Sequence, residues 1–101
     1  MLHIVNKSPF ENTTLASCLR VVGKGGDNAL LLIEDGVYAI TKNSDAGKAV
    51  HAVMGGVKVY ALMPDVEARG MQDRVLEGVT MVDYAGFVDL VIEHNNVQSW
   101  L

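Results

Sequence analysis

The strongest constraint on the fold is an uninterrupted apolar run, Ala29 to Ile33, within the segment NALLLIEDGVYA at residues 28–39. The run does not alternate between polar and apolar residues, so a strand here must be buried on both faces, as in the centre of a parallel sheet. It stops at the turn signal Glu34-Asp35-Gly36, and an apolar stretch follows at once. Open α/β sheets place ligands or partners at such strand-to-helix corners. We therefore expect a parallel α/β sheet organised around this strand.

Shorter signals on both sides of this run predict the remaining elements. Strands are expected at 2–5, 58–63 and 80–82, and helices at about 13–22, 45–54, 65–69 and 84–94, with a short helix or extended turn at 36–40. Asn12 or Thr13 is expected to cap the first helix, and Gly23, Gly25 and Gly26 to end it. This order predicts an α/β fold with three layers, a mostly parallel sheet of four to five strands and helices on both faces.

Apolar spacing predicts the buried face of the three longer helices. In the first helix Cys18 lies on the flank of a stripe formed by Leu15, Leu19 and Val22. The second helix is expected to place His51 in solvent and to turn inward Ala46, Ala49, Val50 and Val53. The last helix, capped by Asp83, carries a broad apolar face made of Tyr84, Phe87, Val88, Val91 and Ile92.

Composition limits the kinds of function that the chain can have. Its 101 residues suit a single domain, 1–101, and they are 50% hydrophobic and only 20% charged. With a mean hydropathy of +0.22, part of the surface is expected to be buried in an oligomer. A net charge of −4 and the lack of any Lys/Arg cluster argue against direct nucleic-acid binding. Without a signal peptide or an apolar run of spanning length, we expect a cytoplasmic protein that does not enter a membrane.

Three carboxylates, Asp35, Asp65 and Asp83, each follow a predicted strand, so a parallel sheet would gather them along one edge. They could form an acidic pocket for a metal ion. Helix capping explains the same positions, and it is the favoured interpretation because Asp commonly caps helices. Lys58 and Thr80 open strands at the opposite edge, so neither completes a phosphoryl-receiver site.

No metal or cofactor is predicted from the remaining reactive side chains. His3, His51 and His94 share no ligand spacing with one another or with Cys18, the single cysteine. A thiolate at Cys18 could attack a persulfide and carry sulfur. No cation lies three or four residues away to lower its pKa, so an inert cysteine in the core or at an interface is favoured.

Four segments together resemble the TusB/DsrH family of sulfur-relay proteins: LHIVNKSPF, LLLIEDGVYA, KVYALMPDVEARG and VDYAGFVDLVIEHNNVQSW. The likeness runs over nearly the whole chain. It implies a DsrE-like fold, related to the Rossmann and flavodoxin folds, and a subunit of a cytoplasmic heterohexamer of the DsrEFH or TusBCD type. The implied partners are DsrE/TusD-like and DsrF/TusC-like subunits and sulfur carriers of the TusA and DsrC/TusE types.

The resemblance also implies that such complexes pass persulfide sulfur between carrier proteins, with the main sulfur-bearing cysteine on the DsrE/TusD-like partner. This chain is then an accessory subunit, with Cys18 a candidate secondary sulfur carrier. Ser17-Cys18-Leu19 resembles an SCL motif of DsrH-type proteins, which favours intracellular sulfur oxidation. The alternative is a TusB-like subunit for 2-thiolation of the tRNA wobble uridine, and a more distant one is a stand-alone ligand-binding module that uses the acidic edge.

Overall fold

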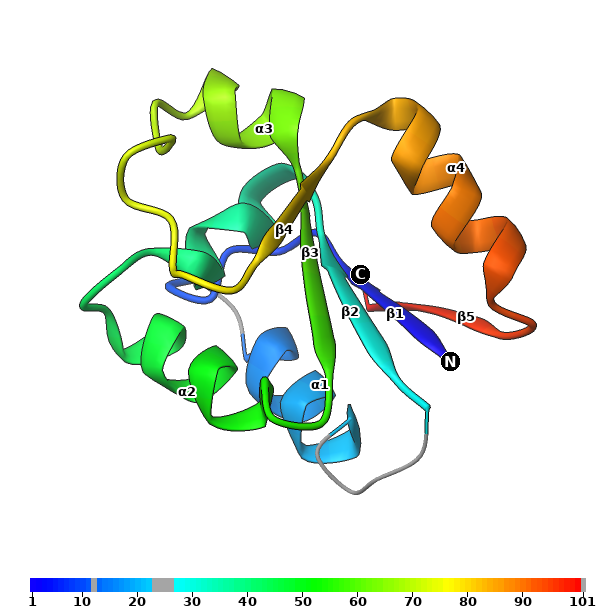
Figure 1. Cartoon of the computed structure of the whole chain (residues 1–101). Coiled ribbons are helices and arrows are strands. Elements are labelled where there is room, and N and C mark those ends of the chain that lie inside the picture. Colours follow the sequence, from blue (N-terminus) through cyan, green and yellow to red (C-terminus); the bar gives the residue numbers. More distant parts are fainter. Residues whose placement is uncertain (12, 23–26, 101) are drawn as a thin grey trace.

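Five strands and five helical segments follow one another along the chain in a computed structural model that describes residues 1–11, 13–22 and 27–100 (Figure 1). The strands are β1 (Leu2–Val5), β2 (Ala29–Leu32), β3 (Lys58–Leu62), β4 (Thr80–Val82) and β5 (Val97–Trp100). The helices are α1 (Thr14–Val22), the 3₁₀ helix η1 (Glu34–Ile40), α2 (Asp45–Val53), α3 (Met63–Ala68) and α4 (Tyr84–Glu93). Asn12 and Gly23, Gly25 and Gly26, expected to begin and end the first helix, lie outside the described residues.

All five strands are parallel and lie in the order β4-β3-β2-β1-β5. Strand β2 is central, and all four of its residues are buried, which confirms the prediction made from its unbroken apolar run. Strand β5 was not predicted, because its first three residues are exposed and give no burial pattern. Pairing with β1 alone therefore makes Val97–Trp100 a strand.

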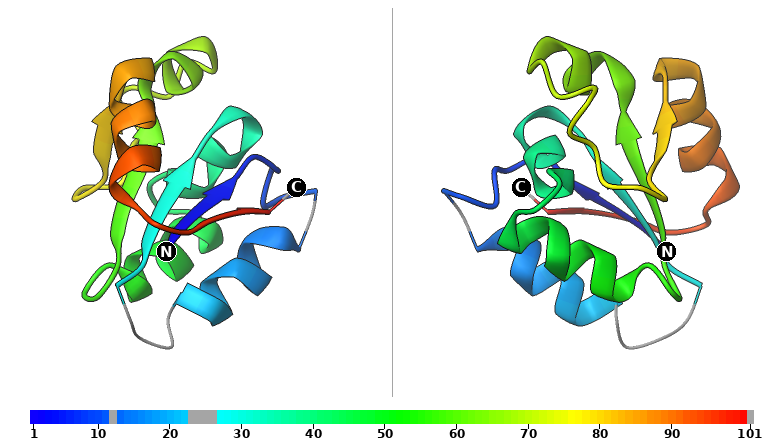
Figure 2. Two further views of the ribbon diagram at one scale, coloured as in Figure 1. Left: turned by 90° about the vertical axis from the view of Figure 1, so that its right-hand side faces the viewer. Right: turned by 60° about the vertical axis from the view of Figure 1, so that its left-hand side comes forward.

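Helices cover both faces of the sheet, as predicted, but unequally (Figure 2). The connections from β1 to β4 all step in one direction across the sheet, so their right-handed crossovers place α1 and α2 on the same face. The connection through α4 returns across the sheet to β5, and the same handedness places α4 on the other face. One face is thus covered by α1, α2 and η1, with Val66 of α3 packed into the same core, and α4 is the one described helix on the other face.

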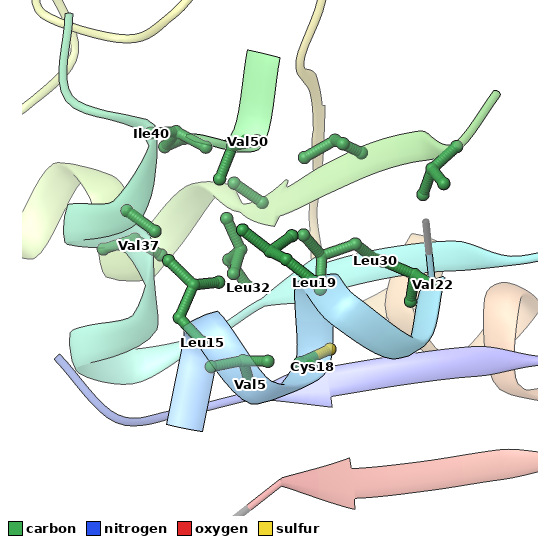
Figure 3. Packing of buried hydrophobic residues seen from close by; sticks show 14 of the residues in the cluster. Val5, Leu15, Cys18, Leu19, Val22, Leu30, Leu32, Val37, Ile40 and Val50 are labelled. Atoms are coloured by element: carbon green, nitrogen blue, oxygen red, sulfur yellow. The ribbon is translucent and has the colours of Figure 1, made fainter. Parts of the chain in front are cut away.

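The larger core lies between the sheet and the α1–α2 layer (Figure 3). Helix α1 contributes Leu15, Cys18, Leu19 and Val22, all buried. Cys18 was predicted on the flank of this stripe, but it has no exposed surface and belongs to the buried face. The face is broader than the sequence suggested because α1 packs onto both β1 and α2 and so is covered on two sides.

In helix α2, Val50 is buried and His51 exposed as predicted, but the prediction for Ala49 was wrong because its side chain is exposed. Gly47 takes the inward position in its place. A Cβ atom on Gly47 would clash with the Thr41 carbonyl oxygen, so glycine permits a close approach here. That contact turns the helix so that residues 47 and 50, and not residue 49, face the core.

Helix α4 differs most from its predicted packing. Leu90 is buried and Phe87 is partly buried against the smaller core on this face. The rest of the predicted apolar face points outward, because its members are all exposed: Tyr84, Val88, Val91 and Ile92. An apolar helix that is the single cover of a sheet face buries one side and leaves the opposite side in solvent.

Candidate functional site

The three strand-end carboxylates lie at the carboxyl edge of the sheet, but each is engaged in a different bond. Asp83 caps α4, because its Oδ1 accepts a hydrogen bond of 2.8 Å from the Gly86 N–H. This confirms the capping prediction for Asp83. Asp65 and Asp35 do not cap the helices in which they lie, so the prediction was wrong for those two residues.

Asp65 stabilises the neighbouring element instead of its own. Its Oδ2 accepts a hydrogen bond of 2.7 Å from the N–H of Glu34, the first residue of η1. The residue before Glu34, Ile33, has no side-chain acceptor to cap η1. Asp65, in the first turn of α3, supplies this acceptor. Glu34 itself has a φ of 49°, an unfavourable region for a residue with a side chain, and the bond to Asp65 helps to hold it there.

Asp35 forms an ion pair with Arg69 at the end of α3. The Arg69 Nε and Nη2 atoms lie 3.1 and 2.8 Å from the Asp35 Oδ1 atom. The guanidinium also lies 5.9 Å from the centre of the Tyr38 ring. The hydrogen bond to Asp35 raises the pKa of Arg69, so this side chain remains charged. Arg69 thus joins α3 to η1, a contact that the sequence analysis did not foresee because the two residues are far apart in the chain.

These bonds argue against an acidic metal pocket at this edge. One carboxylate caps a helix, one accepts a backbone N–H and one is paired with arginine. Across the described ranges 1–11, 13–22 and 27–100, no three His, Cys, Asp or Glu side chains are placed to hold a metal ion. The arrangement therefore serves to fix the strand-to-helix corners.

The β2–η1 corner packs directly on the end of the neighbouring strand. Gly36 lies so close to β1 that a Cβ atom there would clash with the Val5 carbonyl. Its N–H donates to the Ile33 carbonyl at 2.8 Å, which closes the turn. The turn signal found in the sequence therefore marks a point where two backbones come into close contact.

Cys18 lies far from that edge chemistry, among aliphatic side chains between α1 and the sheet (Figure 3). Burial raises the pKa of its thiol to about 12 because an apolar site disfavours the charged thiolate. At neutral pH the side chain is a protonated thiol with no solvent access. In the chain by itself, Cys18 therefore has the properties of a packing residue.

The three histidines are not brought together. His51 is exposed on α2. His94 ends α4, where its Nδ1 atom lies 2.8 Å from the Leu90 carbonyl oxygen and supplies a donor to the carboxyl end of the helix. His3 is buried within β1.

His3 joins the first and last strands of the chain. Its Nδ1 accepts a hydrogen bond of 3.1 Å from the Trp100 Nε1–H, and its Nε2 lies 3.3 Å from the Asn28 Oδ1 atom. An Nδ1 that accepts must be unprotonated, so the proton of the neutral ring is assigned to Nε2. Burial lowers the pKa of His3, which favours this neutral form. No local sequence pattern indicates this contact, since Trp100 lies 97 residues after His3.

A broad, open hollow of about 590 Å³ lies at the amino ends of the strands, opposite the acidic edge. No sequence pattern indicated this hollow. Its walls come from the starts of β2, β3 and β4, the α2–β3 turn and the end of α4. Its polar side chains include Asn28, Lys58, Tyr60, Thr80, Glu93 and His94.

Within the part of the chain that the structure describes, no helix is long and apolar enough to cross a membrane.

Comparison with known proteins places these features in a family. The family model described as DsrH like protein matches residues 7–97. Curated relatives called Protein TusB from Pectobacterium parmentieri and Shigella flexneri are 38% and 35% identical to this chain over 101 residues, covering 99% of it and 100% of each relative. Relatives with that name are thus similar over their full length.

Solved structures share the fold at low sequence identity. The crystal structure of the ychN protein from E. coli has a TM-score of 0.80 and 18% identity, with 97% of each chain covered. A protein of unknown function from Methanobacterium thermoautotrophicum has a TM-score of 0.76 and 23% identity, covering 97% of this chain and 95% of that one. The family match and the full-length relatives together show that the chain belongs to the TusB/DsrH family of sulfur-relay proteins.

Proposed function

We propose that this chain is an accessory subunit of a cytoplasmic DsrEFH/TusBCD-type complex that relays persulfide sulfur between carrier proteins. Its partners are then a DsrE/TusD-like and a DsrF/TusC-like subunit, together with sulfur carriers of the TusA and DsrC/TusE types. Family membership supports a role in sulfur relay. The high hydrophobic content supports assembly of the chain with partner subunits.

The burial of Cys18 is the observation that carries the accessory role. In persulfide transfer an acceptor thiolate attacks the outer sulfur of the donor persulfide, a new S–S bond forms, the old one breaks and the donor leaves as a thiolate. The acceptor must therefore be ionised and reachable. Cys18 is neither, since it has no exposed surface and a pKa raised to about 12. The reacting cysteine is then expected on a partner subunit.

For the pathway, we propose 2-thiolation of the tRNA wobble uridine. Full-length relatives called TusB support this branch. Intracellular sulfur oxidation is the second candidate, favoured by the DsrH-like Ser17-Cys18-Leu19 sequence. Packing of Cys18 in the core already accounts for the cysteine in that motif, so the motif does not distinguish the two pathways.

Deletion of the gene in its own organism tests the pathway. We expect 2-thiouridine at the tRNA wobble position to fall sharply when nucleosides are measured by mass spectrometry, and to recover when the wild-type chain or Cys18→Ala is supplied. Unchanged 2-thiouridine together with a block in the oxidation of stored sulfur would assign the chain to the second candidate. Unchanged levels of both products would reject a role in sulfur relay.

Cys18 as a secondary sulfur carrier remains a separate hypothesis, which requires the core around α1 to open within the complex. Intact-mass measurement after loading the assembled complex with persulfide distinguishes the two roles. The accessory role predicts no added sulfur on this chain, whereas one added sulfur on the wild type and none on Cys18→Ala would make Cys18 a carrier.

A further inference from the structure

The outer face of α4 exposes a continuous set of large apolar side chains. Residues 84, 88, 91 and 92 are spaced at four, three and one, so they share one side of the helix. Ile92 is 74% exposed and Tyr84 63%. We call this set the α4 patch: Tyr84, Val88, Val91 and Ile92. Apart from Val97 on β5, the other exposed large apolar side chains among the described residues, Met1, Phe10 and Val21, lie outside α4.

The patch exists because one helix is too narrow for the sheet face that it covers. Five strands at about 4.8 Å spacing extend over about 19 Å between the two edge strands, whereas a helix is about 10 Å wide. The smaller core accordingly unites Leu90 with side chains of β1 and β2. Val97 on β5 is paired with Leu2 and so shares its face of the sheet, yet 42% of Val97 is exposed. The cover therefore does not extend to the β5 edge.

Contacts of α4 show which way the patch points. Gly86 lies against Val82 of β4, and Glu93 lines the same hollow as Thr80 at the start of β4. These residues place one flank of α4 over β4. Val91 is about 160° around the helix from Glu93, so it lies on the flank nearer β5. The α4 patch and the exposed Val97 thus face the same uncovered side of the molecule.

The two charged residues that α4 carries beside the patch are both negative. Asp89 and Glu93 follow the patch around the helix, and α4 contains no Lys or Arg. Lys58 lines the same hollow as Glu93, and no other Lys or Arg is among the described residues that line it. If two copies met through antiparallel α4 helices, the acidic flank of one would face the acidic flank of the other, and like charges would repel.

We propose that the α4 patch, extended by Val97, is the surface through which this chain docks a different protein, one with an apolar docking surface bordered by Lys or Arg opposite Asp89 and Glu93. Opposite charge at the border directs the approach, and burial of the apolar centre supplies most of the affinity. The inference rests on the proposed function for the kind of partner, a related subunit of the relay complex.

Binding measurements with the DsrE/TusD-like and DsrF/TusC-like subunits of the same organism test the proposal. The variant Val88→Gln/Ile92→Gln removes the centre of the patch while keeping good helix formers. We expect it to remain a folded monomer by circular dichroism and to bind at least about tenfold more weakly, as for a central apolar contact. Val21→Gln, on the exposed side of α1, is the matched control and is expected to bind like the wild type.

A charge variant tests the chemistry of the partner. Asp89→Lys is expected to slow association and to reduce the dependence of binding on salt. Equal binding by wild type, Val88→Gln/Ile92→Gln and Asp89→Lys would overturn the α4 surface and leave the proposed function standing. Concentration-dependent self-association that Val88→Gln/Ile92→Gln abolishes would overturn the choice of partner in favour of a second copy. No binding of either subunit by the wild type would instead reject the proposed function.

Discussion

Replacement and chemical labelling of Cys18 give the sharpest test of the core. The pKa of about 12, against an ordinary value of 9.0, lowers the fraction of thiolate at neutral pH by about a thousandfold. Burial of the Cys18 side chain also keeps a labelling reagent away from the thiol and slows its modification further. With Ellman's reagent at pH 8 we therefore expect the native chain to react at least about a thousandfold more slowly than the urea-unfolded chain.

Stability measurements complete this test. Cys18→Ala removes a buried sulfur atom and should lower the free energy of unfolding by about 1–2 kcal/mol. Cys18→Ser adds a buried hydroxyl, so its free energy of unfolding should be about 1–3 kcal/mol lower than that of Cys18→Ala. The difference is smaller if the hydroxyl donates a hydrogen bond to the backbone carbonyl one turn earlier in the helix. Each kcal/mol corresponds to a fall of about 4–8 °C in Tm for a chain of this size.

The Tm, measured by calorimetry or circular dichroism, should decrease from the wild type to Cys18→Ala and further to Cys18→Ser. A native labelling rate within tenfold of the unfolded rate, or a Cys18→Ser variant as stable as the wild type, would contradict the placement of this side chain in the core. The accessory role argued from its burial would then lose its basis.

Three further predictions concern the sheet and its edges. Because burial holds the pKa of His3 below 6.5, the unfolded chain binds the proton first, so stability should be full above pH 6.5 and fall as the pH drops toward the lowered pKa; fluorescence of Trp100, the single tryptophan, reports the loss of its bond to His3, and His3→Phe should remove this pH dependence. Gly36→Ala should destabilise by about 1–3 kcal/mol in urea titrations, because its Cβ meets the Val5 carbonyl; a neutral result would contradict the close approach. Asp83→Ala should cost about 1 kcal/mol through loss of the α4 cap, whereas Asp83→Asn should retain most of it.

The central part of the fold could be predicted from the sequence because its signals are local. Burial on both faces removes the alternation of a strand, so the run at 29–33 was enough to place β2 at the centre of a parallel sheet. The cap at Asp83 is equally local, since donor and acceptor are three residues apart. Family membership also followed from short segments in a fixed order.

Tertiary structure decided which side chains are available for function. Asp35 and Asp65 looked like caps, but their partners Arg69 and Glu34 lie more than thirty residues away and no local pattern indicates them. Strand β5 exists only through its pairing with β1.

The same is true of the two features on which the proposals depend. An apolar residue on a helix is buried or exposed according to how many neighbouring elements pack against that helix, and the path of the chain across the sheet sets that number. Strands β1 and β5 and helix α2 all contact α1 and enclose Cys18, whereas Ile92 lies on the uncovered side of α4 and is in solvent. The sequence by itself therefore determined the elements and their apolar faces, and the chain path determined that a cysteine is enclosed and a docking surface exposed.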